Sequence, residues 1–290
     1  MLESIEDVLK KLNEHQYLAD ENLATVLYLA YHLPRPLLVE GPAGVGKTEL
    51  AKVMARILGA KFIRLQCYEG LDEAKALYEW NYQQQLLKIQ YESREEKSWQ
   101  DIKGDIFTEE FLLKRPILEA LTSREPVVLL VDELDKSDGE FESFLLEALS
   151  DFQVSIPEIG TVKAQRIPLV VLTSNGTRDF EDALKRRCLH LYINYPDYHM
   201  ELTIIKLKNP GLTENLACQL TDFVQKIREL ALRKPPGISE TLDWAQTMII
   251  LGVDKLEADL VKKTLPVLIK YQQDMGKVEK QVPSLLSGSG

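Results

Sequence analysis

The stretch Leu37-Leu38-Val39-Glu40-Gly41-Pro42-Ala43-Gly44-Val45-Gly46-Lys47-Thr48 decides the fold of this 290-residue chain. Its apolar start, Leu37 to Val39, predicts a buried parallel strand. The segment Gly41 to Thr48 then follows the pattern G-x-x-x-x-G-K-[ST], and an apolar helical stripe comes after it. Strand, glycine-rich loop and helix in this order predict a loop that holds nucleotide phosphates.

Each residue type in the loop suits this task. Glycines let successive backbone N–H groups converge on a phosphate at the start of a helix, where the helix dipole adds positive potential. Lys47 is expected to reach the β- and γ-phosphates of ATP, and the Thr48 hydroxyl to bind Mg²⁺. The predicted nucleotide-binding residues are Gly41, Pro42, Ala43, Gly44, Val45, Gly46, Lys47 and Thr48.

Two carboxylates follow a second apolar run. Val127 to Val131 predicts a buried strand, and Asp132 and Glu133 come directly after it. An Asp at the carboxyl end of a strand beside a phosphate loop suits Mg²⁺ held through water. Glu133 then lies where a base or an orienting group can act on the attacking water.

Polar residues at two further places in the chain are candidates for catalysis. Asn175 ends the apolar strand 169–173 and can position the water or contact the γ-phosphate, although a loop Asn can also cap the next helix. Arg186 and Arg187 end a predicted helix. These cations either complement the helix dipole or provide an arginine finger for the nucleotide site of a neighbouring subunit.

The pattern along the chain predicts an α/β fold. Runs at 62–65, 127–131, 169–173 and 189–193 join the first strand in a five-stranded parallel sheet, with helices on both faces. We expect this core to span residues 1–195, with an insertion at about 67–126. Its acidic stretch 91–110 is expected at the surface. Turn residues at 157–160 predict a β-hairpin over about 152–166 on the edge of the sheet.

After Pro196 the pattern is helical only. Segments near 198–208, 213–232, 239–251 and 254–275 predict a small all-helical lid domain over residues 196–280. Residues 281–290 end in Ser and Gly and are expected to form a flexible tail.

Composition excludes several classes of protein. The net charge is −10, which disfavours a protein built to wrap nucleic acid, because such proteins usually carry a basic face. The three cysteines and four histidines show no metal-ligand spacing, so no structural metal is expected, and the cysteines are expected to be reduced thiols. No apolar run approaches the length of a membrane span, and the N-terminal acids exclude a signal peptide. A cytoplasmic protein is expected.

The ordered set of phosphate loop, Asp132-Glu133, Asn175, Arg187 and helical lid resembles the AAA+ ATPases. Within them, the insertion and the hairpin resemble the clade with a helix-2 insert and a pre-sensor hairpin. Three segments are similar to the MoxR family in its CoxD-like branch. They are Arg-Leu-Gln-Cys-Tyr-Glu-Gly-Leu-Asp (64–72), Tyr-Glu-Trp-Asn-Tyr (78–82) and Leu-Leu-Glu-Ala-Leu-Ser-Asp-Phe (145–152).

The resemblance implies roles for single residues. Lys47 and Thr48 match the Walker A motif and Asp132 and Glu133 the Walker B motif, Asn175 matches sensor 1, and Arg187 matches the finger better than Arg186. One position departs from the family pattern. Thr241, in Gly237-Ile238-Ser239-Glu240-Thr241, replaces the sensor-2 arginine, and Arg233 or Lys234 is the candidate substitute.

The leading hypothesis is an ATP-hydrolysing chaperone that works as a ring, by resemblance a hexamer, with the finger acting in trans. The resemblance implies a von Willebrand A-domain partner and a client protein, often a metal-dependent enzyme. One alternative is an ATP-binding conformational switch or adaptor with little turnover. Another is a clamp-loader-like, DNA-related AAA+ ATPase, which the acidic charge and the MoxR-like segments disfavour.

Overall fold

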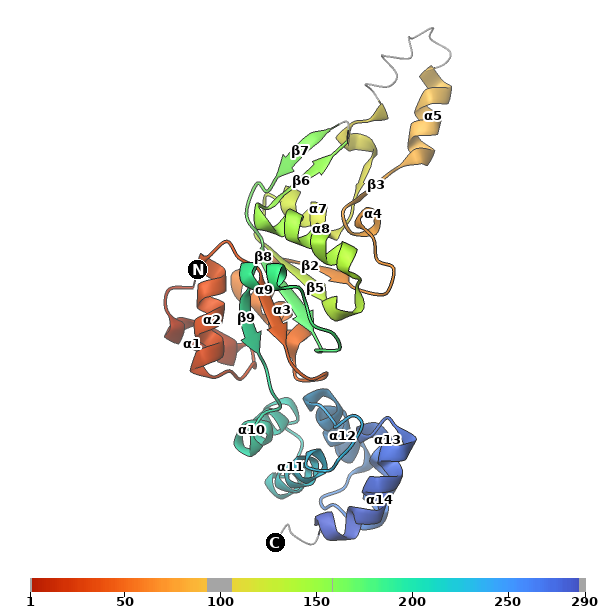
Figure 1. The fold of residues 1–290 in the computed structure, drawn as a ribbon. Coiled ribbons are helices and arrows are strands. Elements are labelled where there is room, and N and C mark those ends of the chain that lie inside the picture. Colours follow the sequence, from red (N-terminus) through yellow and green to blue (C-terminus); the bar gives the residue numbers. More distant parts are fainter. Residues whose placement is uncertain (1, 93–105, 158, 287–290) are drawn as a thin grey trace. The chain divides into compact units, whose positions relative to one another are not determined.

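A computed structural model describes residues 2–92, 106–157 and 159–286. These residues form two compact units (Figure 1). The sheet unit comprises the residues up to Leu12, Ala19–Glu40 and Thr48–Leu191. The helical unit comprises Asn13–Leu18, Gly41–Lys47 and the residues from Tyr192 onward. The phosphate loop up to Lys47 is therefore grouped with the helices, and Thr48 with the sheet.

The sheet unit is built on five strands in the order β2-β5-β8-β1-β9. Their bounds are β1 Leu37–Glu40, β2 Lys61–Gln66, β5 Val127–Asp132, β8 Leu169–Ser174 and β9 Leu189–Tyr192. The pairs β2–β5, β5–β8 and β1–β8 are parallel, so all of their carboxyl ends meet at one edge of the sheet. All six residues of β5 and of β8 are buried, which explains why both read as continuous apolar runs. The predicted five-stranded sheet is confirmed.

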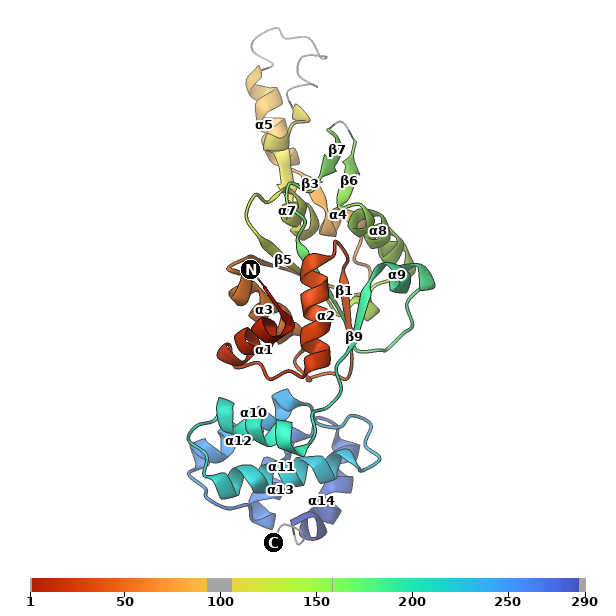
Figure 2. The same ribbon diagram turned by 90° about the vertical axis from the view of Figure 1, so that its left-hand side faces the viewer.

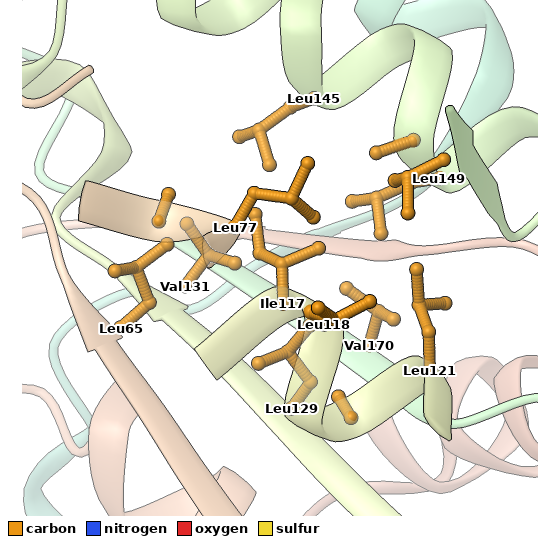
Figure 3. Close-up of a cluster of buried hydrophobic side chains, with 14 of the residues drawn as sticks. Leu65, Leu77, Ile117, Leu118, Leu121, Leu129, Val131, Leu145, Leu149 and Val170 are labelled. Carbon is orange, nitrogen blue, oxygen red and sulfur yellow. The ribbon is translucent and has the colours of Figure 1, made fainter. Parts of the chain in front are cut away.

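Helices cover both faces of this sheet. On one face lie α1 Ile5–Glu14, α2 Glu21–His32 and α3 Lys47–Leu58 (Figures 1 and 2). On the other lie α7 Pro116–Thr122 and α8 Gly139–Ser150, whose apolar side chains pack on those of β2, β5 and β8. Figure 3 shows the centre of this core, with Leu65, Leu129, Val131 and Val170 from the strands and Leu77, Ile117, Leu118, Leu121, Leu145 and Leu149 around them.

The insertion contains a pair of short strands that the sequence did not predict. Short helix α4 Glu73–Ala76 leads into β3 Tyr78–Trp80, which pairs antiparallel with β4 Leu112–Lys114. Helix α5 Tyr82–Glu92 and the 3₁₀ turn η1 Glu109–Phe111 lie between them in the chain. Each strand has only three residues and the partners are far apart in sequence, so no periodic pattern or turn motif marks them. Most of the acidic stretch 91–110 falls in residues 93–105, outside the described residues.

The hairpin is present but is not part of the main sheet. Strands β6 Gln153–Ile156 and β7 Gly160–Lys163 pair antiparallel and form a sheet of their own. Val154 and Ile156 are buried in the core beneath α8, whereas most of β7 is exposed. The expectation that the hairpin extends the edge of the main sheet is therefore wrong, because its buried face packs on α-helical side chains.

The helical unit contains five helices after residue 197. They are α10 Tyr198–Lys208, α11 Glu214–Arg228, α12 Ile238–Leu251, α13 Ala258–Leu268 and α14 Gln272–Leu286. Phe223 and Trp244 are fully buried at its centre with their rings 5.3 Å apart, and the Trp244 indole N–H donates to Thr264 Oγ1 at 2.9 Å. The single segment expected at 254–275 is in fact α13 and the start of α14.

The expectation of a flexible tail from residue 281 is corrected for residues 281–286. Helix α14 continues to Leu286, and Val282 and Leu285 are buried in the helical core. The Lys226 ammonium also donates to the Leu285 carbonyl at 3.0 Å. Apolar residues at helical spacing extend the helix into the segment that was predicted as a tail from its Ser and Gly residues. Residues 287–290 are outside the described part.

Candidate functional site

The phosphate loop has the backbone that its glycines predict. Gly41, Gly44 and Gly46 all have positive φ, at 149°, 79° and 95°, which only glycine adopts without strain. Lys47 opens α3, and its buried ammonium donates to the carbonyl oxygens of Gly41 and Pro42 at 2.7 Å each. The lysine therefore arches back over the loop, in the position from which it can meet phosphate charge.

Thr48 and Asp132 meet in the sheet unit. Asp132 is the last residue of β5, is 2% exposed, and lies opposite Gln66 of β2. Thr48 Oγ1 donates toward both carboxylate oxygens of Asp132, at 3.1 and 3.2 Å. The structure thus brings together two predicted Mg²⁺-binding side chains that are 84 positions apart in the chain.

Asp132 has two further partners. Thr173, from β8, donates its hydroxyl to Asp132 Oδ1 at 2.5 Å. Arg64, from β2, donates through Nε and Nη2 to Asp132 Oδ2 at 3.0 and 2.6 Å. The Asp132 carboxylate, at the end of β5, therefore links side chains from α3 and from the two strands beside β5, which are β2 and β8.

These side chains suit Mg²⁺. A threonine hydroxyl and an aspartate carboxylate are hard oxygen donors, and Mg²⁺ commonly takes one or two protein oxygens and completes its shell with water and phosphate oxygens. Within the described ranges, no cluster of three or more His, Cys, Asp or Glu side chains forms a metal cage. The donor set fits a cation that arrives with a nucleotide rather than a resident structural metal.

Glu133 lies just beyond the strand in an unusual backbone conformation. Its φ is 56° and its ψ is 49°, in the left-handed region that few residues other than glycine adopt. Its N–H donates to Thr173 Oγ1 at 2.9 Å. Gln66 Nε2 and Lys136 Nζ donate to its Oε2 at 2.8 and 2.5 Å. Backbone strain of this kind, held by neighbours on both sides, is often found at catalytic positions.

The carboxylates influence two titratable neighbours. The hydrogen bond to Glu133 raises the pKa of the Lys136 ammonium, which therefore stays charged beside the carboxylate. Burial, and then the negative charge of Asp132, raises the pKa of the Cys67 thiol to about 12. Cys67 is 1% exposed and remains a neutral thiol, so it is a packing residue rather than a nucleophile.

Asn175 follows β8 at the same edge of the sheet and is partly buried. The loop after it is bonded to the segment that follows Asp132 and Glu133. Thr177 donates its hydroxyl to Asp135 at 2.6 Å, and Arg178 donates to the fully buried Glu142 of α8 at 2.8 Å. Asn175 is thus held on a short, well-anchored loop.

Arg187 occupies a different place. It ends α9 Asp182–Arg187, and its guanidinium donates to the Ser150 hydroxyl and, at 3.3 Å, to the Leu146 carbonyl. Leu146 and Ser150 lie in the second half of α8, about 10 and 16 Å along that helix from its first residue. A cavity of about 650 Å³ opens beside Arg187, lined by Arg35, Arg186, Glu147, Asp151 and neighbouring residues. Pro34 and Pro36, which come just before β1, also line this cavity, whereas Asp132 is the last residue of β5. Because β1, β8 and β5 run parallel, Arg187 lies toward the opposite end of the strands from Asp132.

The sensor-2 position is filled by a buried residue. Thr241 in α12 is fully buried, and its hydroxyl lies 3.0 Å from the Gly237 carbonyl and 3.2 Å from Glu201 Oε1. The guanidinium of Arg233, one suggested substitute, stacks over the Tyr271 ring at 4.6 Å. The backbone N–H groups of Arg233 and Lys234 both donate to Asp274. These contacts fix residues 233 and 234 beside α14.

Four residues around the carboxylates were missed in the sequence. Arg64 and Gln66 alternate on β2 and so share one face of that strand, which is a signal that was available once β2 was predicted. Lys136 lies three residues after Glu133, and Thr173 is one of the two polar residues, with Ser174, that end an otherwise apolar strand. Their contacts with the carboxylates depend on which strands are neighbours in the sheet. The order of the strands along the chain does not give their order in the sheet.

The family description "ATPase family associated with various cellular activities (AAA)" matches residues 37–195, more than half of the chain. The chain belongs to the AAA family. Two curated relatives in staphylococci are uncharacterized proteins. One, from Staphylococcus haemolyticus, is 24% identical, and the aligned region covers 98% of that relative and 93% of this chain. The other, from Staphylococcus epidermidis, is 24% identical, covering 77% of this chain and 78% of the relative.

Solved structures of RuvB variants from Thermotoga maritima have the same fold as this AAA chain. One has a TM-score of 0.52 over 87% of this chain and 70% of RuvB, and a second has a TM-score of 0.50 over 91% and 70%. Sequence identity is 18% in both cases, so the similarity is one of fold. The AAA core and the C-terminal helical region predicted from the sequence are confirmed. No helix among the described residues is long and apolar enough to cross a membrane.

Proposed function

We propose that this AAA chain hydrolyses ATP as one subunit of a ring and uses the cycle to remodel or activate a client protein, as a MoxR-type chaperone. The observation that carries the proposal is the paired setting of the two carboxylates. Asp132 bonds to Thr48, while the adjacent Glu133 is held in a left-handed conformation by Thr173, Gln66 and Lys136. Such a pair separates the task of holding a cation from the task of activating water.

The proposed mechanism assigns one step to each group. Bound Mg²⁺ would neutralise phosphate charge, and Thr48 and Asp132 would hold it. Lys47 would bind the phosphates from within the loop. Glu133, which accepts a hydrogen bond from Lys136, would accept a proton from the attacking water, and Asn175 would orient that water.

The assignment of Arg187 as a finger acting in trans rests on its position and on the MoxR resemblance. Arg187 lies at the end of α9, away from the carboxylates of its own chain, beside an open cavity with charged walls. A finger that reaches a neighbouring subunit needs head-to-tail contacts, and head-to-tail contacts that close produce rings. A hexamer, a von Willebrand A-domain partner and a metal-dependent client follow from the same resemblance.

The test separates binding, hydrolysis and subunit contact. Glu133→Gln should bind ATP with Mg²⁺ normally and lose turnover, because the amide cannot accept the proton. Arg187→Ala should also bind and fail to hydrolyse, whereas Arg186→Ala, the matched control next to it, should retain most turnover. Mixing Glu133→Gln with Arg187→Ala subunits should restore part of the activity if the finger acts across an interface. Normal turnover by Glu133→Gln would refute the role of Glu133 as the base and with it the proposed mechanism.

One observation favours a second candidate, an ATP-dependent conformational switch with little turnover. The sensor-2 position is a buried threonine rather than an exposed cation, so α12 offers no charge at this position to a γ-phosphate. Single-turnover and steady-state rates measured on wild-type protein separate the candidates. A switch would hold unhydrolysed ATP over many minutes, whereas a chaperone would release ADP repeatedly and faster in the presence of its partner.

A further inference from the structure

The turn that leads into α12 and includes the first four residues of that helix touches the backbone of the phosphate loop within the helical unit. This turn, residues 236–241, was singled out in the sequence only for its missing arginine. The Ser239 N–H donates to the Gly44 carbonyl at 3.2 Å. The contact is therefore made by main-chain groups, so the identities of the side chains in the turn do not indicate it.

The approach of the two backbones leaves no room for a side chain at Gly237. A Cβ added there would lie 2.7 Å from the Ala43 carbonyl oxygen and 2.8 Å from Gly44 Cα, both backbone atoms that cannot rotate away. Gly237 has φ −83° and ψ −179°, an extended conformation open to any residue. Glycine is therefore needed here for space and not for conformation.

The opposite side of the contact is equally tight. A Cβ on Gly44, whose φ is 79°, would lie 2.9 Å from Glu240 Oε2 and 3.2 Å from Gly237 Cα. The Glu240 carboxylate is itself fixed, because the Gly237 N–H donates to Oε2 at 3.0 Å. The turn thus limits the positions that the Ala43–Gly44 peptide can take.

A buried ion pair holds the turn in place. Arg228 donates from Nε to the Pro236 carbonyl at 2.8 Å and from its two terminal nitrogens to Glu201 at 2.6 Å each. The side chains of Arg228 and Glu201 are only 8% and 0% exposed, and the guanidinium stacks over Tyr195 at 4.8 Å. The Thr241 hydroxyl, between Glu201 and Gly237, completes the support.

We propose that the turn 236–241 is a positioning element of the nucleotide site, which fixes the Ala43–Gly44 segment of the phosphate loop so that its N–H groups are set for phosphate. Arg228 is its positioning residue and acts through the Pro236 carbonyl. In this arrangement a firmly held backbone contact replaces the mobile charge of a sensor-2 arginine. The inference rests on the proposed function, since it requires that the loop binds a nucleotide.

The test changes the contact by one methyl group. Gly237→Ala should weaken binding of a fluorescent ADP analogue with Mg²⁺ by on the order of tenfold, since small displacements of a binding loop are costly. Gly276→Ala is the matched control, because a Cβ at that position in α14 meets no atom within 4 Å. Gly276→Ala should bind as wild type does. The melting temperature without nucleotide is measured for both, and a merely structural role for Gly237 would lower it without changing the affinity.

Arg228→Lys provides an independent variant if Gly237→Ala fails to fold. Lysine keeps the charge beside Glu201 but cannot supply the Nε bond to Pro236 in addition, so nucleotide affinity should fall while the protein stays folded. Unchanged affinity in a folded Gly237→Ala or Arg228→Lys protein would overturn the inference. Lys47→Ala, measured in the same assay, separates the two levels. If Lys47→Ala is the only variant that loses nucleotide binding, the proposed function stands and the inference about the turn fails. If the wild-type protein binds no nucleotide, the proposed function and the inference both fail.

Discussion

Two arginine–carboxylate pairs of the same length lie in very different surroundings. In the sheet unit Arg64 bonds to Asp132 at 2.6 Å, and in the helical unit Arg228 bonds to Glu201 at 2.6 Å. The Arg64 side chain is 46% exposed, whereas that of Arg228 is 8% exposed. Both carboxylates are almost completely buried, so only the cation's access to water differs.

This difference indicates which pair can open. A half-exposed guanidinium that leaves its partner is rehydrated, so the exchange costs little. A buried guanidinium that leaves a buried carboxylate exposes neither to water, so the cost is high. Asp132 also bonds to Thr48 and Thr173 and can change partners, whereas Glu201 holds the arginine that supports the turn 236–241. The first pair belongs to a site that must accept a ligand, and the second to a framework.

Breaking the buried pair should have the largest effect. Arg228→Met leaves the Glu201 carboxylate buried without its cation and should lower the free energy of unfolding by about 3–5 kcal/mol. Urea unfolding followed by far-UV circular dichroism measures this. The double variant Arg228→Met, Glu201→Leu should regain much of the loss, because no charge is then buried. Equal stabilities of the single and double variants would contradict this view of the pair.

Removing the hydroxyl that Asp132 and Glu133 share should have a smaller effect on stability. Thr173→Val deprives the Glu133 N–H of its acceptor and Asp132 of a donor, and should cost about 1–3 kcal/mol. It should also reduce ATP turnover, because Glu133 loses a contact that fixes its backbone. Thr173→Ser keeps the hydroxyl and is the matched control, expected to retain turnover. If both variants hydrolyse ATP equally, the Thr173 hydroxyl does not position Glu133.

Breaking the half-exposed pair should hardly change stability. Arg64→Gln should lower the free energy of unfolding by about 1 kcal/mol or less. Because Arg64 and Mg²⁺ compete for the same carboxylate, its removal should lower the Mg²⁺ concentration needed for nucleotide binding, by up to about fivefold. Titration of Mg²⁺ at fixed fluorescent nucleotide measures this. A shift to higher Mg²⁺ concentrations would instead make Arg64 a contributor to the bound complex.

The smallest effect is expected where both members of a pair are exposed. Arg115 and Glu79 join β4's end to β3, and their side chains are 45% and 50% exposed. Arg115→Gln should change the free energy of unfolding by about 0–0.5 kcal/mol and leave the Mg²⁺ dependence unchanged. It matches Arg64→Gln in residue type and in exposure of the arginine. A comparable change in Mg²⁺ dependence would show that the effect of Arg64→Gln is not specific to Asp132.

The sequence predicted the sheet well because its signals are local. The apolar runs at β1, β5 and β8 are bounded by polar residues, and these give both the strands and the positions of Thr48, Asp132 and Asn175 at one edge. The partners of the carboxylates depend on strand order instead. Arg64 reaches Asp132 because β2 lies next to β5, although helices and strands of the insertion separate them in the chain.

Close backbone contacts were equally hidden. In the sequence, Gly237 was only one residue of a segment that lacks the expected arginine. The residues next to it in the chain do not indicate that Gly237 packs against the phosphate loop. The hairpin was found from its turn residues, but its separation from the main sheet depends on what its apolar face covers. Local patterns thus gave the elements, and packing decided their partners.

Gly41 has a consequence for the tolerance of the chain to mutation. A Cβ at this position would lie 1.9 Å from the Ile193 carbonyl oxygen, on the segment that leads from β9 into the helices, and its φ is 149°. In a saturation screen for soluble protein, position 41 should reject every substitution even in a background that no longer needs nucleotide, such as Lys47→Ala. At Gly46 an added Cβ would meet only Tyr17 side-chain atoms at ordinary distances, so a substitution there should carry the strain of its φ of 95° but no clash with the backbone. The same motif would then contain one glycine required by the close approach of Ile193 and another required by its backbone conformation.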